Sequence, residues 1–263
     1  MARREKYENV VEHRIDLDDR VFRVLSTDTA GAAAGSPYVL IHGIGMSHRY
    51  FTRLHDELAA DAPVHSIDLP GFGGLPKPGR DLDVTEMATA LAEVIDRVIG
   101  EPVVLVGHSM GAQWVVELAV LRPDLVLGVV AMGPVSDDRH RTVMAQARAL
   151  AIDSLGEPPR ANAIVFGDYL RCGVRWYLTQ VRHMVSYPIE DRVAQLRAPL
   201  LVLRGGSDPI AGVEWCRRLR DRALDAAFVT APRGFHVVQW SAPRAVASAI
   251  AAFVSGRVEA PTP

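Results

Sequence analysis

The residues with the clearest chemical potential lie in the pentapeptide Gly107–Gly111, which reads Gly-His-Ser-Met-Gly. It separates an apolar run, Pro102–Val106, from a stretch with helical periodicity, Ala112–Leu121. A serine flanked by glycines two positions away is typical of a nucleophile elbow, a strand-to-helix turn too tight for larger flanking side chains. Such a turn raises the Ser109 hydroxyl above a sheet edge, beside helix amides that can stabilise a developing oxyanion. The pattern therefore predicts a serine nucleophile.

A serine nucleophile needs a base to remove its proton, and the base needs a carboxylate to orient it. Nine histidines could serve as the base, but only His236 follows the last predicted strand. Asp208 follows the penultimate predicted strand, and the chain order serine, aspartate, histidine suits groups that meet above a parallel sheet. Asp137 and Asp138 also follow a strand and stay open as the alternative acid.

Three other polar residues near these motifs are interpreted as structural. His42 begins the glycine-rich stretch His42–Gly45 and is expected to stabilise that loop through hydrogen bonds. His108, beside the predicted nucleophile, is expected to pack rather than to react. Asp68 precedes a turn rich in glycine and proline and is expected to brace it.

Apolar runs bounded by turn residues predict the strands that carry these groups. An antiparallel pair is expected at the start, and strands that alternate with helices follow it, which predicts an α/β fold with a mainly parallel, doubly wound sheet. The predicted strands are Val10–Leu17, Val21–Ser26, Pro37–Ile41, Pro63–Ile67, Pro102–Val106, Val126–Met132, Pro199–Leu203 and Ala226–Thr230.

Two further helices are predicted outside the elbow. Asp83 and Glu86 have the spacing of a capping box and start a helix with one apolar stripe, which Gly100 closes. An amphipathic helix is expected over Pro243–Val254.

Residues from about Ser136 to Arg197 interrupt the strand–helix alternation. They read as two to four helices separated by glycine and proline, which predicts a helical cap, 136–197, over the carboxyl edge of a core formed by 1–135 and 198–263. The apolar side chains of this cap are expected to line a substrate pocket above Ser109. They are Trp176, Tyr169, Tyr177 and Met184, with Val165, Phe166 and Leu170 beside them.

The composition is that of an ordinary globular protein. Of 263 residues, 49% are hydrophobic and 23% charged, and the net charge of −2 gives no reason to expect nucleic acid or an anionic membrane as partner. No apolar run has signal-peptide character or the length of a membrane span, so a cytoplasmic location is expected. Cys172 and Cys216 lack any disulfide or metal-binding pattern and are expected to be reduced thiols; no metal or cofactor is predicted.

Taken together and in order, five motifs resemble those of the α/β-hydrolase superfamily, in its form with a serine nucleophile and a small helical cap. The motifs are His42–Gly45, Asp68–Gly73, Gly107–Gly111, Gly205–Asp208 and Gly234–His236. The resemblance extends from Val21 to Val254. It implies that the backbone amides of Ile44 and Met110 form the oxyanion hole.

Serine at the elbow bears on the reaction class. Members of the superfamily that act on alkyl halides or epoxides carry aspartate there, whereas Ser109 favours an acyl-enzyme. The expected reaction is therefore hydrolysis of a carboxylic ester, thioester or lactone of a small, largely apolar substrate. Carbon–carbon bond hydrolysis of dienone-type substrates is an alternative, because His236–Trp240 partly resembles that subgroup, although Val237 and His108 depart from it. A ligand-binding receptor without catalysis is the alternative of another class.

Overall fold

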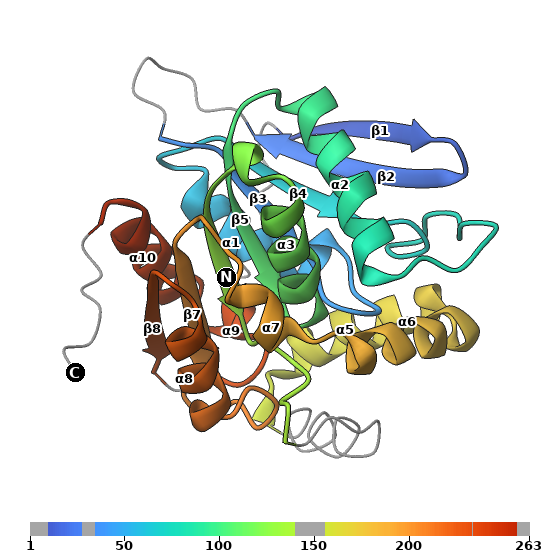
Figure 1. The fold of residues 1–263 in the computed structure, drawn as a ribbon. Helices are drawn as coiled ribbons and strands as arrows, with labels where there is room; N and C mark the ends of the chain where they lie inside the picture. Colours follow the sequence, from blue (N-terminus) through green and yellow to red (C-terminus); the bar gives the residue numbers. More distant parts are fainter. Residues whose placement is uncertain (1–9, 28–34, 140–155, 233, 257–263) are drawn as a thin grey trace.

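One mixed sheet forms the centre of the protein (Figure 1). The computed structural model describes residues 10–27, 35–139, 156–232 and 234–256, and within these its strand order is β1-β2-β4-β3-β5-β6-β7-β8. β2 pairs antiparallel with β1 and β4, and every other neighbouring pair is parallel. The predicted α/β fold with a mainly parallel sheet is confirmed. The strands are β1 Val11–Leu17, β2 Arg20–Thr27, β3 Tyr38–Ile41, β4 Val64–Asp68, β5 Val103–His108, β6 Val126–Met132, β7 Leu200–Gly205 and β8 Ala226–Ala231.

Side chains of the central strands alternate between two hydrophobic cores, one on each face of the sheet. In β5, Val103 and Leu105 belong to the first core, and Val104 and Val106 belong to the second. Because helices cover both faces, both sets of side chains are buried, and the strand is apolar throughout instead of alternating with polar residues. For this reason the central strands can be predicted from short continuous apolar runs in the sequence.

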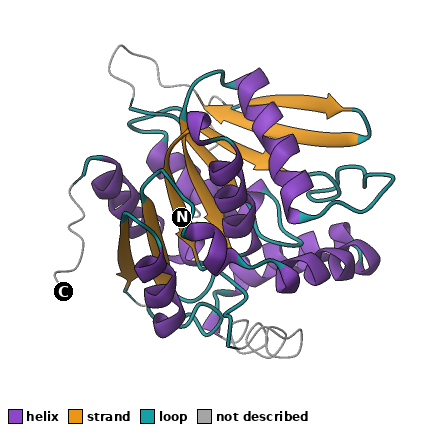
Figure 2. Ribbon diagram, viewed as in Figure 1, coloured by secondary structure: helices purple, strands orange, loops and turns teal. Residues whose placement is uncertain are grey.

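The helices lie on both faces of the sheet, in purple around the orange strands of Figure 2. The first core is covered by α2 (Val84–Val98), α3 (Met110–Leu121) and α8 (Val213–Arg222). The second is covered by α1 (Thr52–Leu58) and α10 (Pro243–Val254). The short helices η1 (His48–Phe51), η2 (Pro123–Leu125) and α9 (Val238–Ser241) connect these elements.

The start of α2 shows how local sequence sets a helix boundary. The Asp83 side chain accepts from the Glu86 amide at 2.8 Å, and the Glu86 side chain accepts from the Asp83 amide at 3.0 Å. The predicted capping box is confirmed. By contrast, the sequence patterns do not predict α1 or α8: α1 has seven residues, and α8 buries only Trp215, Cys216 and Leu219. Stripes this short are too weak to stand out from loop sequence.

Three described helices, α5 (Pro159–Cys172), α6 (Val174–Ser186) and α7 (Ile189–Val193), lie between β6 and β7. We call residues 156–197 the insertion. Its side chains contact Gly45 and Gly71, in the loops after β3 and β4, and the segment after β8, so it packs at the carboxyl edge of the sheet. Residues 140–155 of the predicted cap lie outside the described residues.

Both cysteines, Cys172 and Cys216, are buried and form no disulfide. No helix among the described residues combines the length and the apolar character needed to cross a bilayer. In the same part of the chain, no cluster of three or more histidine, cysteine or acidic side chains could hold a metal ion.

Candidate active site

Ser109 occupies a strained turn between β5 and α3. Its φ of 59° and ψ of −123° lie in a region that residues other than glycine rarely adopt. The Ser109 amide donates to the Met132 carbonyl at 2.9 Å, which holds the turn against the end of β6. A Cβ atom on Gly107 would overlap with the Gly111 backbone, and one on Gly111 would overlap with the Ile41 carbonyl. Both glycines are therefore required by close backbone approach.

The residues after β7 and β8 form a buried acid–base pair. The His236 Nδ1–H donates to Asp208 Oδ2 at 2.9 Å. The other carboxylate oxygen accepts from the amides of Ile210 and Ala211, at 2.8 and 2.9 Å. Burial by itself raises the pKa of the Asp208 carboxyl, but the charge and hydrogen bond of His236 and the two amides outweigh it, and the pKa lies below its ordinary value. Asp208 is thus an anion that fixes the His236 ring.

The two alternative acids lie elsewhere. Asp137 and Asp138 both form ion pairs with Arg218 of α8, at 2.5 and 2.7 Å. Of the acids that the sequence left open, it is Asp208 whose carboxylate contacts His236.

The His236 ring lies beside the elbow. Its centroid is 4.6 Å from that of His108, the residue preceding Ser109. The ring also contacts Gly133, directly after β6, where an added Cβ would lie 3.0 Å from His236 Cε1. Ser109 is bound to the carbonyl of Met132, one residue before Gly133. The ends of β5 and β6 therefore bring the serine and the histidine to the same part of the sheet edge.

The loop after β3 contacts the serine. A Cβ on Gly43 would lie 2.9 Å from Ser109 Cβ and 3.4 Å from Ser109 Oγ. Ile44 is the next residue of this loop, and Met110 is the first residue of α3. The first amides of a helix have no partner within it, so the Met110 amide suits an oxyanion beside Ser109. The family resemblance indicates the amides of Ile44 and Met110. Ile44 follows Gly43, which contacts Ser109, and Met110 follows Ser109 itself.

His42 fixes this loop. Its Nδ1–H donates to the Gly43 carbonyl at 2.8 Å, and its Nε2 accepts from the Leu69 amide at 3.0 Å. Burial lowers the pKa of His42, which keeps the ring neutral and its Nε2 able to accept. These contacts agree with a structural role.

Asp68 has a similar bracing position. Its carboxylate accepts from Arg23 Nη1 at 2.9 Å and from the His48 amide at 2.6 Å. A Cβ on Gly73 would lie 2.6 Å from Asp68 Oδ2, so the glycine turn wraps closely around the carboxylate.

Tyr169 and Tyr177 of the insertion lie over the loop after β3. A Cβ on Gly45 would overlap with the Tyr169 ring and lie 3.2 Å from Tyr177 Cδ2. The two rings meet edge to face with centroids 5.2 Å apart. The tyrosine pair therefore covers the backbone next to Ile44.

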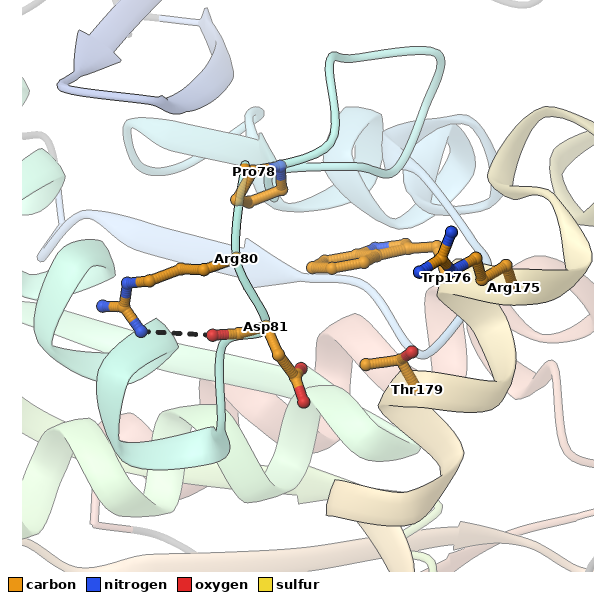
Figure 3. A pocket seen from close by; sticks show the side chains of 7 residues that line it. Pro78, Arg80, Asp81, Arg175, Trp176 and Thr179 are labelled. Carbon is orange, nitrogen blue, oxygen red and sulfur yellow. Dashed lines mark hydrogen bonds between the residues drawn. The ribbon is translucent and has the colours of Figure 1, made fainter.

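Trp176 lies farther along the same edge. It packs against Gly71, where an added Cβ would lie 2.5 Å from Trp176 Nε1, and its ring centroid is 6.2 Å from that of Phe72. It also lines a cavity of about 330 Å³ between the insertion and the loop before α2 (Figure 3). The residues that line this cavity are Pro78, Gly79, Arg80, Asp81, Arg175, Trp176 and Thr179, and they do not include the serine, aspartate or histidine of the site.

Met184 is buried, and its backbone ties the insertion to the core. Its carbonyl accepts from Gln113 Nε2 of α3 at 2.9 Å and from Ser136 Oγ at 2.8 Å.

The expectation that Phe166 and Leu170 line a pocket is wrong, because their exposed fractions are 65% and 69%. The buried residues of this helix are Ala161, Asp168 and Cys172, and Asp168 accepts from Ser47 Oγ at 2.5 Å and from Arg49 Nη1 at 3.3 Å. The hydrogen bonds of this carboxylate orient α5, so the apolar residues on its other side face solvent.

Two residues without any sequence signal also contact the site. The Tyr50 hydroxyl accepts from the Gly43 amide at 2.6 Å and lies 2.8 Å from His108 Nδ1. Glu157 Oε1 accepts from the Val237 amide at 2.6 Å. Neither residue belongs to a motif, and the contacts of Tyr50 with His108 and of Glu157 with Val237 join segments 58 and 80 residues apart in the chain.

The fold and the site define the class of protein. The sequence model of the alpha/beta hydrolase family matches residues 38–249, and the chain belongs to this family.

Particular relatives are hydrolases and biosynthetic proteins. The chain is 28% identical over 239 residues to the biotin biosynthesis bifunctional protein BioHC of Cellvibrio japonicus, covering 82% of this chain but only 47% of that protein. It is 26% identical over 239 residues to the (E)-2-((N-methylformamido)methylene)succinate hydrolase of Acinetobacter baylyi, covering 84% and 90% of the two chains. Among solved structures, a thermophilic esterase from Thermogutta terrifontis superposes with a TM-score of 0.77 at 20% identity, over 96% of this chain and all of the other (100%).

Proposed function

We propose that this protein is a serine hydrolase that cleaves a carboxylic ester, thioester or lactone of a small, largely apolar substrate. The observation that supports it most is the convergence of three groups at one sheet edge. Ser109 is presented by a strained turn, and the Asp208–His236 pair is buried beside it with the carboxylate held as an anion. A serine presented by a strained turn, and an imidazole held by a carboxylate anion, are features of an acyl-enzyme route.

The chemistry follows from which atoms are already engaged. His236 Nδ1–H is bound to Asp208, so Nε2 is the ring nitrogen that takes the proton from Ser109 Oγ. Oγ then attacks the substrate carbonyl carbon, and the amides of Ile44 and Met110 stabilise the resulting oxyanion. The imidazolium returns its proton to the leaving alcohol or thiol as the carbon–oxygen or carbon–sulfur bond breaks. Water, activated by the same nitrogen, then releases the acid and restores the serine.

Two further observations favour an apolar substrate of ester type. Tyr169 and Tyr177 present ring surface over the loop that carries Ile44, where the acyl or alcohol part would lie. Relatives of this chain include a protein named as a hydrolase, and its structural neighbours include one named as an esterase. Trp176 and Met184 stay candidates for the more distant wall of the same pocket.

The test combines a fluorophosphonate probe with a substrate panel. We expect the probe to label Ser109 and the protein to hydrolyse short acyl nitrophenyl esters, and Ser109→Ala to lose at least about 10³-fold in turnover because the triad acts as a unit. Ser207→Ala, which removes an exposed hydroxyl of the loop before Asp208, is the matched control and should keep both properties.

The panel also separates the alternatives. It spans acyl chain lengths, thioesters, lactones and dienones. Turnover of dienones without turnover of esters would contradict the proposed ester cleavage and favour carbon–carbon bond hydrolysis. A wild-type protein that the probe does not label and that turns over no member of the panel would contradict the enzyme proposal and favour a binding role.

A further inference from the structure

The peptide group that joins His236 to Val237 is held on both sides. Its carbonyl accepts from His108 Nε2–H at 2.9 Å, and its N–H donates to Glu157 Oε1 at 2.6 Å. Carbonyl and N–H belong to one planar unit, so the two bonds together fix the orientation of that plane. This peptide group is bonded to the Cα atom of His236, the proposed base. Its orientation therefore helps to set the direction in which the His236 side chain leaves the backbone.

The core side of this arrangement is a chain of buried hydrogen bonds. A carbonyl can only accept, so His108 carries its proton on Nε2 and its Nδ1 accepts from the Tyr50 hydroxyl at 2.8 Å. The Tyr50 oxygen in turn accepts from the Gly43 amide at 2.6 Å. Burial, reinforced by the charge of His236, lowers the pKa of His108 to about 3, so this ring stays neutral near neutral pH. The loop that bears Ile44 is thereby tied to the backbone of the base.

The other side belongs to the insertion. Glu157 is buried, with an exposed fraction of 6%. The preceding residue, Gly156, is so close to Phe235 that an added Cβ would overlap with the phenyl ring. The start of the insertion therefore contacts the residues immediately before and after His236. A displacement of this part of the insertion must move the segment that carries the base.

We infer that Glu157 is a positioning residue through which the insertion orients His236, so that the reactivity of Ser109 depends on the seating of the insertion. The inference rests on the proposed function. The physical reason is that His236 must meet Asp208 and Ser109 at the same time, and a misplacement of about 1 Å can cost on the order of 10²-fold in rate. A carboxylate suits this task because its hydrogen bond to an amide is shorter and stronger than that of a neutral acceptor.

The experiment uses the full chain with Glu157→Ala and Glu157→Gln. The rate at which a fluorophosphonate acylates Ser109 is measured together with kcat and KM for a short acyl nitrophenyl ester. We expect Glu157→Ala to lower the acylation rate and kcat by about 10- to 100-fold, with KM changed less than about threefold. Glu157→Gln keeps an oxygen that can accept from the Val237 amide, and its rates should stay within about fivefold of the wild type.

Asp168→Ala is the matched control. Asp168 is another buried carboxylate of the insertion, but it binds Ser47 and Arg49 instead of the segment after β8. Its removal is expected to lower Tm about as much as Glu157→Ala while leaving the acylation rate within about threefold of the wild type. If Asp168→Ala is as slow as Glu157→Ala, general loosening of the insertion explains the effect and the positioning role is overturned.

Glu157→Asp covers the case in which Glu157→Ala does not fold. It keeps the charge but shortens the reach by one methylene, and should slow acylation by about three- to tenfold. Wild-type rates in Glu157→Asp or in Glu157→Ala, or a Glu157→Gln protein as slow as Glu157→Ala, overturn the positioning role alone. A wild-type protein that the probe does not label overturns the serine nucleophile and the positioning role together.

Discussion

The sheet edge and the insertion meet at the same site but are built differently. At the sheet edge, Ser109, Asp208 and His236 each follow a strand, and backbone groups hold the first two directly. In the insertion, side chains hold the helices: α6 and α7 bury apolar residues in the first core, and Asp168 and Glu157 add hydrogen bonds, while some large apolar residues are left at the surface. The exposed apolar residues of α5 and α6 are Phe166, Leu170, Val174 and Leu178.

This difference indicates a division of tasks. Groups held by the ends of parallel strands are placed more precisely than groups on loops, which suits the chemical step. Helices that are joined to the sheet by side chains and not by strand backbone can differ in placement at lower cost, which suits selection among substrates. Substitutions at the sheet edge, and at Glu157, which binds the segment that carries His236, should therefore reduce turnover of all substrates. Substitutions in the part of the insertion that covers the loop after β3 should change preference among them.

The largest effect is expected at the sheet edge. Asp208→Asn keeps the shape of the side chain but removes the charge that stabilises the His236 imidazolium, and we expect kcat to fall about 10²- to 10⁴-fold for every ester. Asp137→Asn and Asp138→Asn, which lie in the ion pairs with Arg218, are the controls. Near-normal turnover of Asp208→Asn, with a large loss in either control, would assign the acid to the segment after β6.

The second effect concerns the stability of the core in acid. His55 is bound to Ser66 and Thr27, at 2.8 and 2.9 Å, and burial, with the charges of His65 and His48, lowers its pKa from 6.5 to about 3. Below pH 6.5 the unfolded chain binds a proton that the folded protein does not, so stability falls as the pH decreases from 6.5 towards 3. Each such histidine contributes about 1.4 kcal/mol per pH unit, a tenfold change in the unfolding equilibrium.

Denaturant unfolding between pH 6.5 and 4 checks this contribution. We expect His55→Gln, which retains polar partners for Ser66 and Thr27, to be less stable near neutrality but to show a shallower decline towards acid. An unchanged slope would mean that His55 is protonated in the folded protein.

The third effect concerns Tyr50, which joins the loop after β3 to His108 at the sheet edge. Tyr50→Phe leaves the Gly43 amide and His108 Nδ1 without their partner, and we expect kcat to fall about five- to tenfold and unfolding free energy by about 1–3 kcal/mol. Tyr187→Phe is the control, because it removes another buried hydroxyl, one that donates to Glu117 at 2.6 Å. Equal losses of kcat in the two variants would reduce the role of Tyr50 to stability.

The smallest effect is expected for Tyr169 of the insertion, which covers the loop after β3. Tyr169→Ala removes the ring over Gly45, and we expect the ratio of kcat/KM between long and short acyl esters to change about three- to fivefold. Trp176→Ala, measured on the same series, shows whether the wall of the proposed substrate pocket extends to Trp176 and Phe72. Phe166→Ala, from the exposed face of α5, should leave the ratio unchanged. A uniform decrease across the series in Tyr169→Ala would make the insertion a scaffold without selectivity.

Much of the fold was predictable because its signals are local. The central strands are buried on both faces and therefore stand out as apolar runs, and the capping box of Asp83 and Glu86 sets the start of α2 within three residues. The elbow is equally local, since the requirement for glycine at Gly107 and Gly111 comes from backbone crowding inside one turn and against the adjacent strand. Short helices such as α1 and α8 lack signals of this strength.

The placement of the insertion was less predictable. Periodicity identifies an apolar face, and it led to the expectation that Phe166 and Leu170 point towards Ser109. The buried side of α5 instead contains Ala161, Asp168 and Cys172, and Asp168 binds Ser47 and Arg49, more than a hundred residues away in the chain. An aspartate at the centre of the buried side conceals that side from an apolar pattern, because the partners that make its burial possible come from the core.

The sequence by itself determined the sheet, the elbow at Ser109 and the order in which the acid and base candidates reach the carboxyl edge, because each depends on neighbouring residues and on strand ends. Only the tertiary structure decided which carboxylate binds His236, and that Tyr50 and Glu157 contact the site. The hydrogen bonds of Asp208 with His236, of Tyr50 with His108 and of Glu157 with Val237 join positions 28 to 80 residues apart. Hydrogen bonds of this kind form only after the sheet and the insertion have come together.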